Sequence, residues 1–190
     1  MDIFRDQADY QFFLSRLREY IHPEEYSREL YTNKERYMRK SFPAGSFTLV
    51  CYCLMPNHFH LLIRQNTDVP LSKLMLSLVG GYSKYFNKKY NRVGSVFQDQ
   101  FKSVLVDSNE YLLWLSAYLH QNPKVAGLVQ NLSEYPYSSY SKCVGLKIDT
   151  LCDPAVILEQ YSNFDAYRNF VEESFAAIKN RKDLEHLLLD

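Results

Sequence analysis

The sequence predicts an α+β protein in which a β-hairpin is preceded and followed by amphipathic helices. Two apolar runs, 47–54 and 58–64, flank a Pro-Asn pair that breaks a strand and turns the chain. Residues 6–21 and 71–90 instead place their apolar side chains three and four positions apart, which is helical spacing. Both patterns in a chain of 190 residues favour a mixed fold with a substantial core.

The remaining elements follow from turn signals and periodicity. In chain order we expect an irregular insertion at 23–45, an interruption at Gly80-Gly81, a strand at 101–106, a helix from about 108 that Asn122-Pro123 ends, and helices at 154–161, 165–180 and 182–189. We expect two domains, at 1–130 and 131–190. The second comprises an aromatic loop and an acidic helical extension.

Composition is ordinary apart from the aromatic residues. Hydrophobic residues make up 46%, charged residues 23%, and the net charge is zero, so bulk charge does not indicate a nucleic-acid partner. The 16 Tyr and 12 Phe suit a core or, less commonly, a surface that stacks bases. Four cysteines without a CxxC pair fit free thiols in a reducing compartment. With no membrane-length apolar run and no signal peptide, we expect a cytoplasmic protein without membrane association.

The triplet His58-Phe59-His60 is the first candidate for chemistry. On a strand, residues two apart lie on one face, roughly 6.5–7 Å apart at Cα. Two imidazoles that lean together at this spacing can share one metal ion. The alternative is two exposed histidines on a solvent-facing sheet.

Tyr118 and Asn122 form a second candidate, on the predicted helix that follows. They are four residues apart, so they share a helix face. The tyrosine can act as a nucleophile and the asparagine as an oxygen ligand to a nearby metal. The alternative is a core tyrosine and an asparagine that ends the helix.

Residues 71–102 form a locally basic stretch, with six Lys or Arg and one acidic residue. Aromatic residues are interleaved with the basic ones, and this combination is typical of single-strand nucleic-acid binding. The candidate DNA contacts in the stretch are Lys84, Lys88, Lys89, Arg92, Gln98 and Lys102. The alternative is a solvated helix face backed by a core stripe.

Four blocks, in order, resemble the REP-associated branch of the single-tyrosine HUH transposases, which are IS200-like. The blocks are MPNHFHLL at 55–62, RVGSVFQDQFKS at 92–103, YLHQNP at 118–123 with AGLV at 126–129, and YPYSSY at 135–140. They are similar to the HUH signature, "RxGxLFQxRYKS", "YIHxNPVxAGLV" and "YPWSSY" of that branch.

The resemblance implies a ferredoxin-like fold, with helices packed on an antiparallel sheet. It also implies a protein that cleaves and rejoins single-stranded DNA at hairpins or palindromic repeats. By matching position, His58, His60 and Asn122 would bind Mg²⁺ or Mn²⁺, and Tyr118 would form a 5′-phosphotyrosine. His120 would be at most a DNA contact. Relatives act as monomers or homodimers.

The chain departs from this family pattern at its start and at one basic position. The family begins with a strand, "YHVTxRG", that lies beside the histidine strand, whereas this chain begins at the helix. Either translation starts upstream, or another segment fills the gap, or this copy has decayed and its sheet lacks that strand. Gln100 replaces an arginine that contacts phosphate. Two other functions therefore stay open. One is a catalytically inactive descendant that binds DNA hairpins, and the other is a metal-dependent hydrolase of small phosphoesters.

Overall fold

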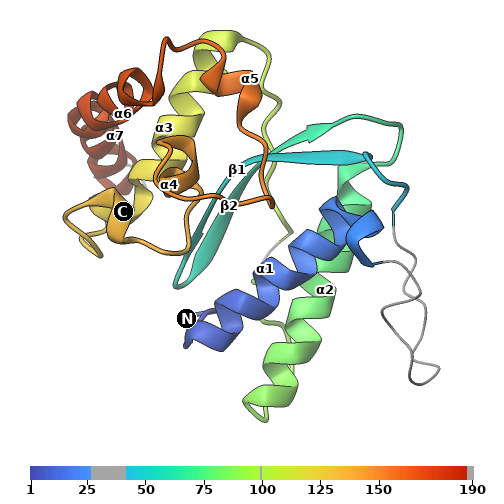
Figure 1. Ribbon diagram of the computed structural model, residues 1–190. Coiled ribbons are helices and arrows are strands. Elements are labelled where there is room, and N and C mark those ends of the chain that lie inside the picture. Colours follow the sequence, from blue (N-terminus) through green and yellow to red (C-terminus); the bar gives the residue numbers. More distant parts are fainter. Residues whose placement is uncertain (27–41, 99, 188–190) are drawn as a thin grey trace. The chain divides into compact units, whose positions relative to one another are not determined.

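The computed structural model describes residues 1–26, 42–98 and 100–187 (Figure 1). Its elements are α1 (Gln7–Ile21), η1 (Pro23–Tyr26), β1 (Phe47–Met55), β2 (His58–Gln65), α2 (Leu71–Lys89), α3 (Asn109–Val125), η3 (Leu132–Glu134), α4 (Tyr140–Cys143), α5 (Ala155–Leu158), α6 (Phe164–Glu173) and α7 (Phe175–Leu187). The predicted α+β class, with an antiparallel sheet and C-terminal helices, is confirmed. Within the described residues, the sheet has two strands.

The β-hairpin forms where the sequence predicts it, with Pro56-Asn57 as its turn. β1 is buried along almost its whole length. On the edge of β1 away from β2, the Leu54 amide donates to the Tyr137 carbonyl at 2.9 Å and the Ser139 amide donates to the Tyr52 carbonyl at 3.0 Å. The predicted aromatic loop therefore continues the hydrogen bonding of the sheet at this edge.

The chain divides into two compact units, and both include parts of the hairpin. The first unit comprises Met1–Leu49, Pro56–His58 and Ile63–Ser103, and the second comprises Val50–Met55, Phe59–Leu62 and Val104–Asp190. These units are not the two predicted domains, so the domain boundary at residue 130 stays a prediction.

In the first unit, α1 packs against α2 (Figure 1). The Phe12 and Tyr85 rings stack with centroids 3.8 Å apart, and the side chains of Tyr82 and Phe86 are fully buried. Asp6 caps α1 by accepting a hydrogen bond from the Asp9 amide at 3.1 Å. This apolar stripe, together with the cap, accounts for the pairing of the two helices.

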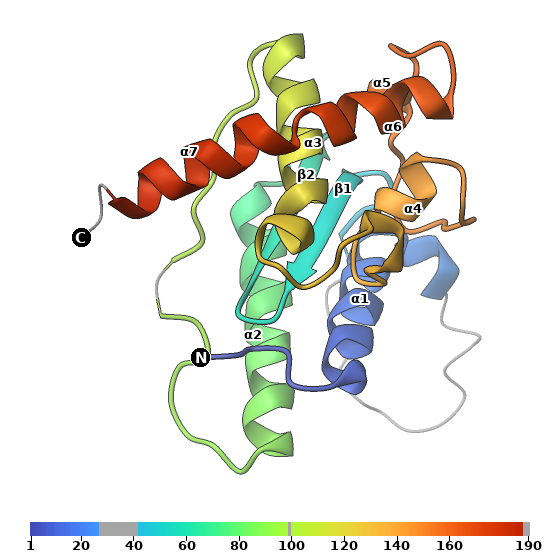
Figure 2. The same ribbon diagram turned by 90° about the vertical axis from the view of Figure 1, so that its left-hand side faces the viewer.

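The second unit is built around α3, which packs against α6 and α7 (Figure 2). Its core combines residues from the hairpin, α3 and the C-terminal helices. The fully buried members are Cys51, Ala117, Cys143, Ile157, Tyr167, Val171 and Ile178. Tyr118 packs against this core from its margin.

Three expectations about elements are wrong. Residues 101–106 form no strand, although their apolar residues suggested one. α2 runs unbroken through Gly80-Gly81, where an interruption was expected. α3 continues past Asn122-Pro123 to Val125.

Two further expectations concern the insertion and the C-terminal extension. The insertion expected at 23–45 lies mostly outside the described residues. The extension is helical as predicted, although its helices are α5, α6 and a long α7, with shifted boundaries. Among the described residues, no helix has both the length and the apolar character that crossing a membrane requires.

Candidate active site

α3 carries the candidate nucleophile and begins at a side-chain cap. Ser108 accepts a hydrogen bond from the Tyr111 amide at 3.2 Å, which satisfies one of the unpaired amides of the first turn. Glu110 in that turn also suits the positive end of the helix dipole. These signals are local, so the start of the helix is predictable from the sequence.

Asn122 and Pro123 act together inside α3. Pro123 has no amide proton, so it cannot donate to the Leu119 carbonyl four residues earlier. The Asn122 side chain compensates, because its Nδ2 donates to the carbonyls of Tyr118 at 2.8 Å and Leu119 at 3.4 Å. This arrangement lets the helix continue, and it leaves Oδ1 as the Asn122 atom that can ligate a metal.

In the second unit, β2 lies against α3, the helix that carries Tyr118. The His60 and Tyr118 rings make an edge-to-face contact with centroids 5.8 Å apart. On its other side, Tyr118 stacks on Trp114 at 5.3 Å. Leu62, on the same face of β2 as His60, is part of the core against which Tyr118 packs. The predicted alternation along β2 is thus realised.

The histidines and Asn122 have donor atoms that fit a divalent ion. His58 is exposed at the start of β2, and its Nδ1 lies 2.7 Å from Asn57 Oδ1. Because that oxygen can only accept, Nδ1 donates to it, and Nε2 is the His58 atom that can ligate a metal. The Nε2 atom of His60 is buried. Two imidazole nitrogens and one amide oxygen suit an ion such as Mn²⁺ and leave coordination positions open.

The predicted DNA contacts fall into two groups. Lys84, Lys88, Gln98 and Lys102 are exposed. Lys89 is exposed too, but it pairs with Asp6 at 2.6 Å and Asp9 at 2.7 Å. Desolvation opposes the charge on Lys89, but hydrogen bonds to both carboxylates raise its pKa well above the usual value.

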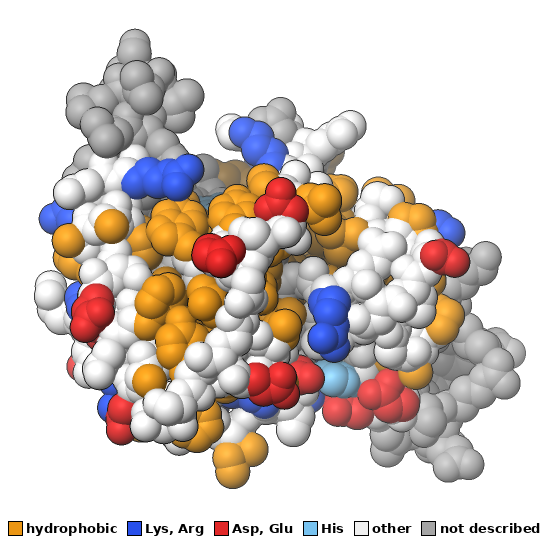
Figure 3. All heavy atoms as spheres, turned by 90° about the horizontal axis from the view of Figure 1, so that it is seen from above, with side chains coloured by type: hydrophobic (Ala, Val, Ile, Leu, Met, Phe, Trp, Pro, Cys, Tyr) orange, Lys and Arg blue, Asp and Glu red, His pale blue; other side chains and the backbone are white. Residues whose placement is uncertain are grey.

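Arg92 and the aromatic rings of α2 are also engaged within the first unit. The Arg92 guanidinium donates to Met1 Sδ at 3.0 Å and lies over the Phe86 ring. Tyr82 and Phe86 are fully buried, so for these rings the core interpretation is right and the base-stacking one is wrong. On the face drawn in Figure 3, Lys and Arg are scattered among acidic and hydrophobic side chains.

His120 is fully buried, so the expectation that it contacts DNA is wrong. It lies beside Cys51 and Cys143, a grouping that the sequence analysis missed. A hydrogen bond from Cys51 lowers the pKa of the Cys143 thiol, and the same hydrogen bond, together with burial, raises the pKa of the Cys51 thiol. The only sequence signal was that Cys51 belongs to a predicted strand of apolar residues.

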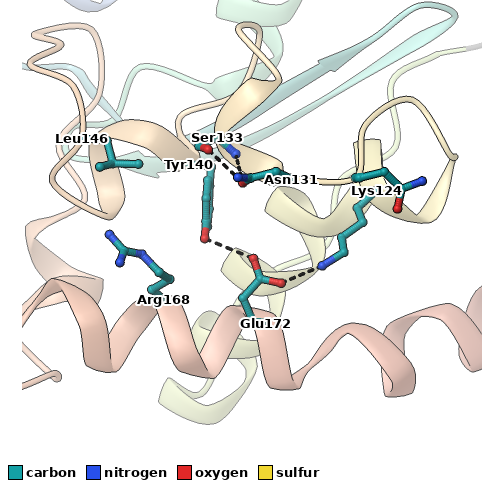
Figure 4. A pocket seen from close by; sticks show the side chains of 8 residues that line it. Lys124, Asn131, Ser133, Tyr140, Leu146, Arg168 and Glu172 are labelled. Atoms are coloured by element: carbon teal, nitrogen blue, oxygen red, sulfur yellow. Dashed lines mark hydrogen bonds and ion pairs between the residues drawn. The ribbon is translucent and has the colours of Figure 1, made fainter.

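A pocket of about 470 Å³ lies elsewhere in the second unit (Figure 4). Glu172 accepts hydrogen bonds from Lys124 at 2.7 Å and from the Tyr140 hydroxyl at 3.4 Å. Arg168 also lines the pocket and pairs with Asp165 at 2.9 Å. Each charged side chain that lines the pocket thus has a partner of opposite charge, although Asp165, the partner of Arg168, is not among the lining residues.

Comparison with known proteins identifies the family. The family described as "Transposase IS200 like" matches residues 13–122, which is more than half of the chain and includes both histidines, Tyr118 and Asn122. The chain belongs to the IS200-like transposase family. No solved structure matches the chain.

One relative within this family is also similar in sequence to the chain. The IS200-like chain is 29% identical over 113 residues to a Haemophilus influenzae protein whose name places it among the REP-associated tyrosine transposases. The match covers 54% of this chain and 64% of that relative, so it spans less than two thirds of the relative's length.

Proposed function

We propose that this protein is a transposase-type endonuclease that cleaves and rejoins single-stranded DNA through a 5′-phosphotyrosine formed on Tyr118. The observation that carries the proposal is the contact between the His60 and Tyr118 rings, at 5.8 Å in the second unit. It joins the histidine strand to the helix that bears the nucleophile. Membership of the IS200-like family supports the same reaction.

In the proposed reaction, the Tyr118 oxygen attacks a DNA phosphorus atom. A bond forms between that oxygen and the 5′-phosphate, the bond to the 3′ oxygen breaks, and the phenol proton is lost as the 3′-hydroxyl gains one. Rejoining is the reverse attack by a 3′-hydroxyl. Bond energy is conserved in the covalent link, so no external energy source is needed.

His58, His60 and Asn122 would hold a divalent ion, Mg²⁺ or Mn²⁺. When bound, such an ion polarises the scissile phosphate and stabilises the charge that develops on it. The two histidines on β2 and the Asn122 amide oxygen on α3 would supply the donor atoms. The contact with Trp114, at 5.3 Å, restrains the Tyr118 ring and so limits the directions from which its oxygen can attack.

The proposed substrate is single-stranded DNA at a hairpin or palindromic repeat. Lys84, Lys88, Gln98 and Lys102 are the exposed candidates for backbone contacts. Lys89 and Arg92 were proposed for the same role, and they would have to exchange their present partners before binding phosphate.

Covalent capture tests this function. The full chain is incubated with a labelled single-stranded hairpin and Mn²⁺, and protein–DNA adducts are resolved under denaturing conditions. Wild type and Tyr111→Phe, a matched change on the same helix, should give the adduct, whereas Tyr118→Phe should give none. A folded wild type that forms no adduct with Mn²⁺ or Mg²⁺ would refute the proposal.

A non-catalytic protein that binds DNA hairpins is the second candidate. The observation that favours this candidate is the small sheet. Within the described residues the sheet consists of the hairpin alone, because residues 101–106 do not form the expected strand. This candidate requires hairpin binding that survives His58→Ala and does not depend on metal, with no adduct from wild type. Electrophoretic mobility shifts measured with and without EDTA distinguish the two candidates.

A further inference from the structure

Three buried side chains from distant parts of the sequence converge in the second unit. Cys51 comes from β1, His120 from α3 and Cys143 from α4. All three residues are fully buried, and the ligand atom that each offers lies within 4.8 Å of the other two. Buried thiols and imidazoles at such spacing are the donors of structural zinc sites.

A chain of hydrogen bonds places a proton on His120 Nδ1. Ser116 donates its hydroxyl to the Leu113 carbonyl at 2.7 Å, so it must accept from the Tyr167 hydroxyl at 3.1 Å. Tyr167 has then used its only proton and accepts from His120 Nδ1 at 2.9 Å. Nδ1 is therefore protonated, and Nε2 is the His120 nitrogen that can ligate a metal.

The other ring nitrogen, Nε2, faces Ser139. Nε2 lies 2.9 Å from Ser139 Oγ, which also donates to the Tyr52 carbonyl at 3.2 Å. A ligating histidine usually donates its other N–H to an acceptor that holds the ring in place. Tyr167 is in that position before any metal is bound.

We propose that Cys51 Sγ, Cys143 Sγ and His120 Nε2 bind a structural Zn²⁺ ion. Ser139 Oγ, 2.9 Å from Nε2, is the candidate for the fourth ligand. With bonds of 2.0–2.3 Å, the ligand atoms must lie roughly 3.4–3.8 Å apart, so each separation has to shorten by about 1.4 Å at most. Zn²⁺ replaces the protons of the two thiols, which are released to solvent.

This site is distinct from the proposed catalytic one in ligands and in chemistry. Thiolates select soft or borderline ions such as Zn²⁺, whereas Mg²⁺ and Mn²⁺ prefer oxygen-rich sites. Zinc here would tie β1, α3 and α4 together, and α3 carries Tyr118. The inference does not depend on strand cleavage, because a binding-only protein could use the same structural ion.

Metal analysis of the purified full chain tests the proposal. After dialysis, the wild type should retain about one Zn²⁺ per chain by mass spectrometry. Replacement by Co²⁺ should produce thiolate-to-metal charge-transfer absorption and the intense visible bands of a tetrahedral site. Cys143→Ser should lose the ion. Cys152→Ser, a buried cysteine outside the group, and His58→Ala should both keep it.

Tyr167→Phe probes the hydrogen bond that orients His120. It keeps all three ligands and removes only the acceptor of the Nδ1 proton, so zinc affinity should fall about 10–100-fold in a chelator competition. An unchanged affinity would mean that His120 is not a ligand.

Three results would overturn the zinc site. They are a folded wild type that takes up neither Zn²⁺ nor Co²⁺, a Cys143→Ser protein that keeps the ion, and a Cys51–Cys143 disulfide in the freshly purified chain. If the variant does not fold, the wild-type cobalt spectrum decides the question alone.

Discussion

At the scale of single residues, the structure separates groups that look alike in sequence. Lys88 and Lys89 are adjacent, yet Lys88 is exposed and Lys89 is held by Asp6 and Asp9. His60 and His120 both occur in transposase-like motifs, yet His60 contacts Tyr118 and His120 is buried among thiols. Residue type gives the available chemistry, while burial and partners decide which part of it is used.

Replacing either histidine of β2 should impair function, but the two replacements should change the stability of the protein by different amounts. His60→Ala removes a ring contact with Tyr118 and should lower the free energy of unfolding by about 1 kcal/mol. His58→Ala, at an exposed position, should change it by less than about 0.5 kcal/mol. Both should lower Mn²⁺-dependent adduct formation at least about 100-fold, because each removes a ligand.

Denaturant titration and covalent capture measure the two effects separately. Normal adduct formation by a folded His58→Ala protein would show that His58 is not a ligand.

At the scale of elements, α1 and α2 are joined by rings and by one buried charge. Asp9 has no exposed surface and accepts hydrogen bonds from Lys89 at 2.7 Å and from Tyr90 at 2.8 Å. Burial opposes its charge, but these bonds and the Arg5 amide outweigh burial, so the pKa of Asp9 lies below its ordinary value of 3.8. The two helices therefore depend on an ionised carboxylate.

Acid should weaken this pairing. A carboxyl group with a lowered pKa in the folded state stabilises the fold above its unfolded value, here 3.8, and this stabilisation is lost as the pH falls through the folded value. Asp9→Asn should cost about 2 kcal/mol at neutral pH and reduce the loss of stability below about pH 4. Urea titrations across pH measure both effects.

Asp165→Asn, at an exposed helix position, is the control and should leave the acid profile unchanged. An Asp9→Asn protein with the acid sensitivity of the wild type would rule out this source of pH dependence.

At the scale of the whole molecule, both compact units include residues of the same hairpin. After the hairpin, the chain passes from the first unit to the second between Ser103 and Val104. The segment around that boundary has no regular structure, and it exposes apolar side chains, with Val104 70% and Leu105 84% exposed. A backbone without helix or strand hydrogen bonds can enter a protease more easily than a helix can.

Limited chymotrypsin digestion should therefore cut after Phe101 and Leu105 before it cuts after Leu76. Leu76 is a suitable control because it is 77% exposed but lies inside α2. Time-resolved mass spectrometry gives the order of cleavage. Earlier cleavage after Leu76 would mean that 101–106 is structured in solution.

The sequence by itself determined the features that depend on local periodicity. Alternation with a period of two placed His60 and Leu62 on one strand face, and a period of 3.6 placed Tyr118 and Asn122 one helical turn apart. The turn at Pro56-Asn57 and the cap at Ser108 were equally local signals. The family blocks led to the same side chains, and the family match covers them.

Only the tertiary structure decided what depends on contacts between distant residues. The segment 101–106 has the composition of a strand, but a strand forms only where a neighbouring edge accepts its hydrogen bonds. The Asn122 amide replaces a bond that Pro123 cannot make, so α3 continues where the sequence predicted its end. Cys51, His120 and Cys143 meet because three separate elements share one core, and no spacing along the chain encodes that meeting.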